Sequence, residues 1–352
     1  MISFYPGPSR VYPEIPRYVQ EAYEAGLLSA NHRSPEFVEV SRKVIRLLHD
    51  RLLIPEDYMI FFTSSATECW EIISQSLVSK ESFHFYNGAF GEKWLQYARQ
   101  LQPAAEGVAF GLEQILPIDY QIDTTDELIA VTYNETSNGT AVSMELIRQL
   151  RDRHPDQLIA VDATSSMAGD LLDFSAADVW YASVQKCFGL PAGLAVMVCS
   201  PRALQRAAEI GEKGHYNSLL YLQQMIENYQ TTYTPNVLGI YLLMRVMEER
   251  PGMEQTATQL QKRYQRYKKE LENFPFAEML VKNDEVRSLT VLALQADKKV
   301  IDQLRQQGRE AGLVLGNGYG AWKETTLRIA NFPAILEDEV EKLIDFLKRF
   351  SM

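Results

Sequence analysis

The sequence predicts an α/β fold in which a large domain with a mostly parallel sheet is followed by a smaller α/β domain at the C-terminus. Short β-rich runs alternate with helical stretches from about residue 35 to residue 198, which is typical of parallel strands covered by helices. The last third instead begins with one long, charged helical stretch. We expect an N-terminal arm at residues 1–15, a large domain at 16–245 and a small domain at 246–352.

Apolar spacing and β-rich runs indicate the elements of the large domain. In the first expected helix, Phe37, Val40, Val44 and Leu48 recur at the helical period. Runs of β-branched and aromatic residues bounded by turn residues indicate the strands. In chain order, the elements are a helix at 35–53, a strand at 58–62, a helix at 68–78, a strand at 127–133, a helix at 144–154, a strand at 158–161, and β-rich runs at 178–186 and 194–198.

The same two patterns indicate the elements of the small domain. The last helix is the clearest, because Val340, Leu343, Ile344 and Leu347 share one face. In chain order, the elements are a helix at 254–274, a strand at 288–294, a helix at 300–311, strands at 313–315 and 326–330, and the final helix.

Composition excludes several classes of protein. The net charge of −11 and the pI near 5.1 argue against nucleic acid and anionic membranes as partners. Three cysteines without a CxxC motif suggest a reducing compartment, and the histidines have no metal-ligand spacing. No signal peptide is recognisable and no apolar run approaches the ~20 residues of a membrane span, so we expect a cytoplasmic protein without a metal.

Lys186 is the first candidate for chemistry. It ends the β-rich run at 178–186, and a second apolar run follows at 194–198. A lysine between two buried strands is costly unless its amine is paired or used, and such an amine can condense with an aldehyde to give a Schiff base. The alternative, which is commoner for a lone lysine, is a side chain at the rim in water.

Two further strands end in polar residues, and ligands of open α/β sheets lie at these carboxyl ends. Ser65 and Thr67 follow the strand at 58–62, where a helix N-terminus offers N–H groups to an anion, or where they merely cap the helix. Asp162 follows the strand at 158–161. At the mouth of a buried sheet it needs a cationic partner, although a turn aspartate is the equal alternative.

An aromatic side chain between glycines completes the set. Phe90 lies between Gly88 and Gly91, where it is either a core residue or a ring that stacks on a flat ligand. Together, an anion cradle, a stacking ring, an acid and a lysine fit a phosphorylated, planar, cationic aromatic aldehyde. Pyridoxal phosphate is such a molecule.

At this level of detail the chain resembles a known family, the class V (fold type I) aminotransferases, and within it most closely the phosphoserine aminotransferases. The motifs that carry the resemblance are Phe4-Tyr5-Pro6-Gly7-Pro8, Asn31-His32-Arg33-Ser34-Pro35-Glu36-Phe37, Asn87-Gly88-Ala89-Phe90-Gly91, Asn134-Glu135-Thr136 with Asn138-Gly139, Val161-Asp162-Ala163, Gln185-Lys186 and Thr234-Pro235. The Asn-Glu-Thr and Gln-Lys motifs in this order, with the aspartate between them, are the more specific part.

The resemblance implies roles around the cofactor, pyridoxal phosphate. Lys186 would bind it covalently and move the proton, Asp162 would pair with the pyridine nitrogen, and Phe90 would stack on the ring, where phosphoserine enzymes usually have tryptophan. Thr136 would bond the ring hydroxyl. The residues implied for the cofactor phosphate are Ser65, Ala66, Thr67 and Gln185.

The resemblance also implies a homodimer with its sites at the subunit interface. Thr234, with Tyr233, would reach the cofactor phosphate from a second subunit. Arg328 would hold the α-carboxylate of the substrate as a bidentate fork, whereas its sequence context alone favours a surface strand arginine. His32 and Arg33 would supply half of a site for a substrate phosphate.

One departure from the family leaves the substrate open. Phosphoserine enzymes place a His-Arg pair before the arginine that corresponds to Arg328, but here residues 316–324 contain Lys323 as the only cation. A dianion binds poorly without such charges. The leading prediction is ping-pong transamination between O-phospho-L-serine and 2-oxoglutarate, as in serine biosynthesis. The alternative is serine or alanine with glyoxylate or pyruvate.

Two other functions are less favoured. A pyridoxal-phosphate-dependent desulfurase, within the lyase alternative, needs a nucleophilic cysteine on a mobile loop, and no cysteine follows Cys199. A non-catalytic homologue has no need to keep Lys186, Asp162 and Arg328 together.

Overall fold

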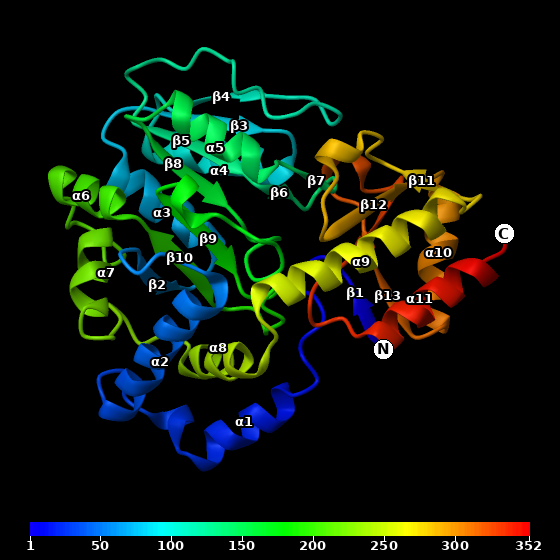
Figure 1. Ribbon diagram of the computed structural model, residues 1–352, viewed down its shortest axis with the longest axis horizontal. Helices are drawn as coiled ribbons and strands as arrows, with labels where there is room; N and C mark the ends of the chain where they lie inside the picture. Colours follow the sequence, from blue (N-terminus) through cyan, green and yellow to red (C-terminus); the bar gives the residue numbers. More distant parts are fainter.

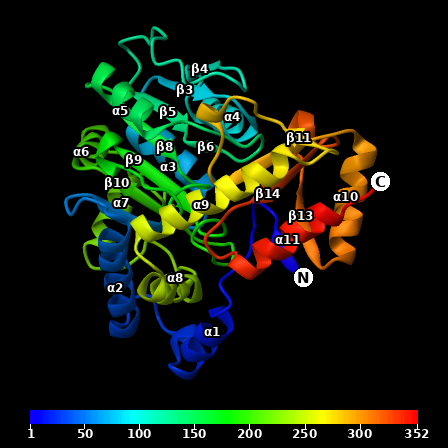
Figure 2. The ribbon, with the colours of Figure 1, turned by 45° about the vertical axis from the view of Figure 1, so that its right-hand side comes forward.

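The computed structural model describes residues 1–352 and contains a seven-stranded sheet and a five-stranded sheet, both packed against helices (Figures 1 and 2). The larger sheet has the strand order β2-β10-β9-β8-β5-β3-β4, and the smaller has the order β1-β13-β14-β12-β11. Figure 1 shows the smaller sheet beside α9, α10 and α11, on the side of the molecule where both chain termini lie. A short hairpin, β6 with β7, follows β5.

The helices and strands from residue 15 to residue 249 build the large domain. Their bounds are α1 (Ile15–Glu24), α2 (Pro35–Leu52), β2 (Met59–Thr63), α3 (Ala66–Leu77), β3 (Ser82–Tyr86), α4 (Ala89–Leu101), β4 (Glu106–Ala109), β5 (Leu128–Thr132), β6 (Asn134–Glu135), β7 (Thr140–Ala141), α5 (Met144–Arg153), β8 (Leu158–Asp162), β9 (Val179–Ser183), β10 (Ala195–Cys199), α6 (Pro201–Ile210), α7 (Leu219–Ile226) and α8 (Val237–Glu249).

The elements of the small domain follow, together with one strand from the start of the chain. Their bounds are β1 (Ile2–Phe4), α9 (Met253–Glu272), β11 (Glu278–Met279), β12 (Val291–Gln295), α10 (Lys298–Glu310), β13 (Leu313–Asn317), β14 (Thr326–Ala330) and α11 (Glu337–Arg349).

The large sheet confirms the predicted fold class. Strands β4, β3, β5, β8 and β9 run parallel, and only β10 runs antiparallel to both of its neighbours. Every residue of β5, β8, β9 and β10 is buried, because helices cover both faces of the sheet. Buried side chains of both sheets, such as Val161 and Ile329, belong to one apolar core. The two sheets therefore pack as one body.

The beginning of the chain differs from a simple extended arm. Ile2–Phe4 forms β1, which pairs in parallel with β13 of the small sheet, so that Ile2 lies opposite Leu313. The chain then crosses to the large domain, where the N–H of Ser9 donates to the carbonyl of Gln185 at 3.0 Å. The proline-rich segment itself has no regular structure, as expected. The domain boundaries predicted at residues 15 and 245 stay a prediction.

Several element ends differ from the predicted ones; β9, for example, ends at Ser183 and not at Lys186. Two of the differences have clear local reasons. Helix α3 begins at Ala66 rather than at residue 68, because the Ser65 side chain caps it by accepting from the N–H of Glu68 at 3.2 Å. Strand β12 begins at Val291 rather than at residue 288. There the Ser288 hydroxyl accepts from the N–H groups of Thr290 and Val291, which replaces the strand ladder with a turn.

The helices are each too short or too polar to cross a bilayer. Nowhere in residues 1–352 do three histidine, cysteine, aspartate or glutamate side chains gather in a way that could hold a metal ion.

Candidate active site

A cavity of about 260 Å³ lies at the carboxyl ends of β5, β8 and β9. Its lining residues are Gly7, Pro8, Ala66, Thr67, Trp70, Phe90, Lys93, Tyr97, Thr132, Asn134, Thr136, Asp162, Thr164, Ser183, Gln185 and Lys186. This volume is slightly below the ~300–1,000 Å³ of pockets for drug-sized ligands, so the cavity suits a compact molecule. A more open hollow of about 390 Å³ lies near Glu127 and Leu158, at the opposite ends of β5 and β8, away from the edge where sheets of this kind bind ligands.

Lys186 is held deep in this cavity and is only 7% exposed. Its Nζ donates to the hydroxyls of Thr136 at 2.8 Å and Ser165 at 2.9 Å. Burial lowers the pKa of the amine to about 8, and the charges of Asp162 and Glu135 oppose the fall. A lysine with this pKa is partly uncharged near neutral pH, which a nucleophilic amine requires.

The N-terminal segment closes one side of the Lys186 cavity. Gly7 has φ +145°, and a Cβ at this position would lie 2.9 Å from the Cε of Lys186. Only glycine lets the backbone pass this close to the lysine in this conformation. Gly7 and Pro8 therefore form a wall of the site.

Asp162 is the last residue of β8 and is 6% exposed. One of its oxygens, Oδ1, accepts from the N–H of Thr164 at 2.9 Å. Burial raises the pKa of the carboxyl, whereas hydrogen bonds from Thr164, the charge of Lys186 and a hydrogen bond with Tyr181 lower it. The acid and the lysine thus face one cavity from neighbouring strand ends, as the sequence predicted.

Two polar oxygens at the cavity have no partner within the chain. They are Oγ1 of Thr132 and Oδ1 of Asn134. A buried polar atom without a hydrogen bond costs about 1–3 kcal/mol. A bound polar molecule can supply the missing bonds, so these atoms mark a ligand-binding cavity.

The stacking ring is held by a buried carboxylate. Glu135 Oε2 accepts from the N–H groups of Phe90 at 3.0 Å and Gly91 at 3.1 Å, and its Oε1 accepts from the N–H and hydroxyl of Ser137 at 2.9 and 2.6 Å. Negative charge at the first turn of α4 also suits the helix dipole. The Phe90 ring centroid lies 5.3 Å from the Nζ of Lys186. Glu135 therefore fixes the first turn of α4 and with it the ring beside the lysine.

A helix N-terminus forms the opposite end of the cavity. The structure brings Ala66, Thr67 and Gln185 to the lining, but it uses the Ser65 side chain as a helix cap. The N–H of Ala66 donates to the Ser183 hydroxyl at 2.9 Å. The first turn of α3 thus points toward the cavity, in the position that favours an anion.

Arg328 belongs to β14 and lies on the far side of Phe90. It is 3% exposed, so it is not the surface arginine that its sequence context alone favoured. Its Nε donates to the carbonyl of Asn317 at 2.6 Å and its Nη1 to the carbonyl of Thr136 at 2.7 Å. The ring of Tyr319 stacks on Phe90 with centroids 5.2 Å apart and lies 5.6 Å from the Arg328 Cζ. Nη2 of Arg328 makes no hydrogen bond within the chain and is free for a ligand.

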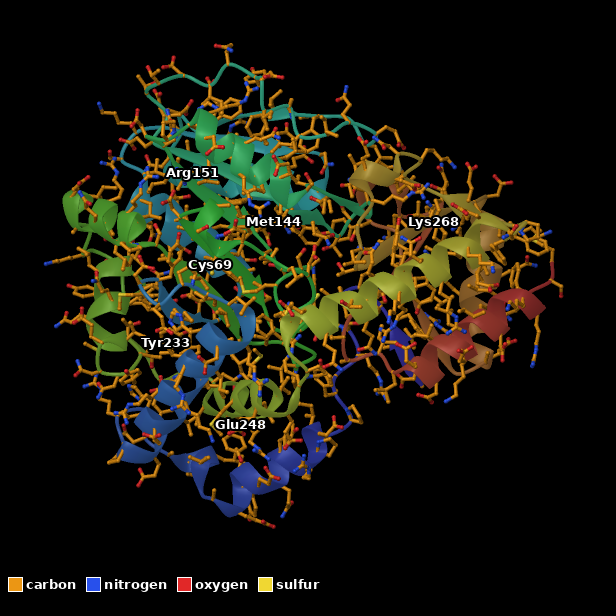
Figure 3. The ribbon with its side chains drawn as sticks, in the orientation of Figure 1. Cys69, Met144, Arg151, Tyr233, Glu248 and Lys268 are labelled. Carbon is orange, nitrogen blue, oxygen red and sulfur yellow. The ribbon has the colours of Figure 1, made fainter.

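Six predicted residues are absent from the lining of this cavity, namely Ser65, Arg328, His32, Arg33, Tyr233 and Thr234. The last four form a separate group, and Figure 3 shows Tyr233 on the part of the large domain that lies away from the small domain. The Thr234 hydroxyl lies 3.4 Å from Nδ1 of His32, so two of the four meet at the surface. This group does not contribute to the site of its own chain.

Comparison with known proteins decides the family. The family model described as aminotransferase class-V matches residues 4–315. The chain belongs to the class V aminotransferases. It is therefore a pyridoxal-phosphate-dependent aminotransferase.

Other members of the class V family match nearly the whole chain. A phosphoserine aminotransferase from Rhodococcus opacus (strain B4) is 28% identical in an alignment of 348 positions that covers 96% of this chain and 91% of that protein. One from Corynebacterium glutamicum (strain R) is 29% identical in an alignment of 367 positions that covers 97% of this chain and 93% of that protein. The crystal structure of a phosphoserine aminotransferase from Cytophaga hutchinsonii ATCC 33406 superposes with a TM-score of 0.94 at 32% identity, covering 99% of this chain and 98% of that one.

The residues of this class V aminotransferase fit its cofactor. The cavity combines a lysine with a lowered pKa, a buried acid, an aromatic ring, a helix N-terminus and unpartnered polar oxygens. These features match an aldehyde, a pyridine nitrogen, a flat ring, a phosphate and polar ring substituents, respectively.

The sequence analysis missed several residues that line the cavity of this aminotransferase. Trp70 lies on α3, and Lys93 and Tyr97 lie on α4. Phe90, Lys93 and Tyr97 are spaced i, i+3 and i+7, which places them on one helix face. Once Phe90 is assigned to the site, this spacing predicts its two neighbours.

Proposed function

We propose that this aminotransferase moves an amino group from O-phospho-L-serine to 2-oxoglutarate by a ping-pong mechanism. The observation that carries the proposal is the pair of Lys186 and Asp162 in one small cavity, in a chain whose relatives are phosphoserine aminotransferases along almost their entire length. Transamination itself follows from the family. The substrates, the residue roles and the dimer are proposals.

Bound pyridoxal phosphate supplies an electron sink for the carbon that exchanges its proton. In our proposal Lys186 Nζ carries that proton, because a lysine with a pKa of about 8 accepts and releases protons near neutral pH. The Asp162 carboxylate would pair with the pyridine nitrogen, Phe90 would stack on the ring, and Thr136 would bond the ring hydroxyl. Thr136 already contacts the lysine amine at 2.8 Å, which supports its place beside the reacting atoms.

The cofactor phosphate is assigned to the first turn of α3. Ala66, Thr67 and Gln185 line that end of the cavity, and Ser65 shapes it by capping the helix. The cavity lining contains no arginine. A phosphate with two charges needs further donors, which supports a contribution from a second subunit.

We propose a homodimer in which Thr234 and Tyr233 of one subunit approach the cofactor phosphate of the other. His32 and Arg33 would then approach the substrate of that same site. His32 and Thr234 contact each other on one surface, outside the cavity of their own chain. This contact supports the proposal that both residues approach the same active site of the other subunit. Light scattering of the purified protein tests the dimer, and a monomer at micromolar concentration would contradict it.

Arg328 is assigned to the α-carboxylate of the amino acid. Its guanidinium is oriented by the carbonyls of Asn317 and Thr136, which leaves Nη2 free for a carboxylate oxygen. Thr136 belongs to the cavity and so connects the arginine to it. Such a fixed fork selects a planar anion.

One observation favours a second substrate class. The loop before Arg328 places Tyr319 against Phe90, and its only cation, Lys323, is exposed. A neutral donor such as serine or alanine, with glyoxylate or pyruvate as acceptor, does not need a cation there.

A panel of amino donors separates the two substrate classes. The bound cofactor changes its absorbance when it takes up the amine, so each half-reaction can be followed by stopped flow with O-phospho-L-serine, serine and alanine. We expect O-phospho-L-serine to react with a kcat/KM at least about tenfold above the others, as a charge-assisted contact worth about 1.5–3 kcal/mol requires. Faster reaction with serine or alanine would replace this donor with the alternative.

A further inference from the structure

A buried hydrogen-bond chain runs beneath the cavity from Trp70 through Tyr181 toward Asp162. Trp70 lies on α3 and lines the cavity, and Tyr181 lies on β9 and is fully buried. The indole Nε1 of Trp70 donates to the phenol oxygen of Tyr181 at 2.7 Å. Tyr181 is in register with Asp162 on the neighbouring parallel strand β8, so their side chains project to the same face of the sheet.

The donors and acceptors of these side chains fix the direction of the hydrogen-bond chain. An indole N–H can only donate, so the Tyr181 oxygen must accept at that contact. The single phenol proton must then be donated to another group. Burial and the negative charge of Asp162 raise the pKa of Tyr181, so the phenol stays protonated and keeps this donor. The Asp162 carboxylate lies opposite Tyr181 in the strand register and raises the pKa of the phenol, so it is the candidate acceptor for this proton.

With the phenol proton directed at it, Asp162 would gain a further donor. The N–H of Thr164 already donates to Oδ1 at 2.9 Å. A buried carboxylate stays ionised only when donors or cations compensate for the loss of water. The phenol therefore supplies, from below the cavity, part of what keeps this acid charged.

We propose that Tyr181 is a positioning residue that holds the Asp162 carboxylate ionised and oriented toward the pyridine nitrogen of pyridoxal phosphate, and that Trp70 fixes the direction of the Tyr181 proton. This inference rests on the proposed role of Asp162. A purely structural role for Tyr181 would affect folding but not the recognition of one ring atom.

The test compares two forms of the cofactor. Pyridoxal phosphate and its 1-deaza analogue differ in one ring atom, because a C–H replaces the nitrogen and cannot pair with a carboxylate. The dissociation constant of each is measured by fluorescence titration of the apo-protein. We expect the wild type to prefer pyridoxal phosphate by tenfold or more, and we expect Tyr181→Phe to reduce that preference about tenfold. The affinity for the deaza analogue should stay unchanged.

Tyr133→Phe is the matched control. The Tyr133 phenol is also buried and donates to a carboxylate, Oδ2 of Asp170, at 3.1 Å, but it does not line the cavity. We expect this variant to keep the full preference. Trp70→Phe retains the Tyr181 phenol and removes only the group that orients it. It should reduce the preference less than Tyr181→Phe does, and it decides the question if Tyr181→Phe does not fold.

Each outcome has a separate meaning. A wild type without preference would overturn the role of Asp162 and with it the inference. A wild type with the preference, and a folded Tyr181→Phe that keeps it, would overturn the role of Tyr181 alone. Equal losses in Tyr181→Phe and Tyr133→Phe would also refute it, because the effect would then not depend on Asp162.

Discussion

Lys186 should destabilise the apo-protein, and this penalty can be measured. Burial lowers the pKa of the amine from its usual 10.5 to about 8. Since one pKa unit corresponds to about 1.4 kcal/mol, the folded state bears a penalty of about 3 kcal/mol at neutral pH. The lysine is charged in both the folded and the unfolded chain below pH 8, so the full penalty is present there. Between pH 8 and 10.5 only the unfolded chain keeps the proton, and stability rises with pH.

Lys186→Met removes the charge and retains most of the side-chain volume. The amine also donates to Thr136 and Ser165, and the loss of these bonds costs about 1 kcal/mol because the two hydroxyls contact each other. We therefore expect the apo variant to be about 2 kcal/mol more stable than the apo wild type at pH 7. This advantage should be lost by about pH 10.5.

Urea unfolding of both apo-proteins at pH 7 and pH 10 measures this double difference, in which the titration of all other groups cancels. Lys80→Met is the control, because Lys80 is exposed and lies outside the cavity. Its difference from the wild type should not depend on pH. A Lys186→Met variant less stable than the wild type at pH 7 would falsify the argument that burial of the charged Lys186 amine destabilises the folded apo-protein.

The other predictions concern catalysis and cofactor binding. Lys186→Ala should fold and lose turnover, as seen by circular dichroism and an activity assay; normal rates would exclude it as the reacting lysine. Arg328→Ala should raise KM for the amino donor at least about tenfold, because the charge-assisted contact from Nη2 is lost; an unchanged KM would remove Arg328 from the site. Glu135→Gln should weaken cofactor binding more than Ser137→Ala does. The amide would direct N–H groups at the Ser137 donors and disturb the turn that carries Phe90. Equal affinities of the two variants for the cofactor would contradict the role of Glu135 in fixing this turn.

The sequence predicted the centre of the site because its signals are local. Asp162 is the last residue of β8 and Lys186 follows shortly after the end of β9, and parallel strands bring their carboxyl ends to one edge. For the same reason the sequence predicted that the start of α3 lies at this edge, where Ala66 and Thr67 line the cavity. Family resemblance added Thr136 and Arg328, whose contact joins residues 192 positions apart. No local pattern predicts such a contact.

Tertiary context explains what the sequence did not predict. Strand β1 has three residues and exists because β13 offers it an edge. No local pattern singles out Trp70 and Tyr181, and only the structure shows their hydrogen bond of 2.7 Å. Tyr233 and Thr234 lie outside the cavity of their own chain, so their predicted role depends on a second subunit.

The first twelve residues contact both sheets. Ile2–Phe4 is paired with β13, Gly7 touches the reactive lysine, and the Tyr12 N–H donates to the carbonyl of Gly189 at 3.1 Å. A shift of the small sheet would therefore displace the backbone segment that lies beside Lys186. Truncation of residues 1–8 would open the cavity wall and leave the edge of β13 unpaired, so an affinity tag or fusion partner belongs at the other end of the chain.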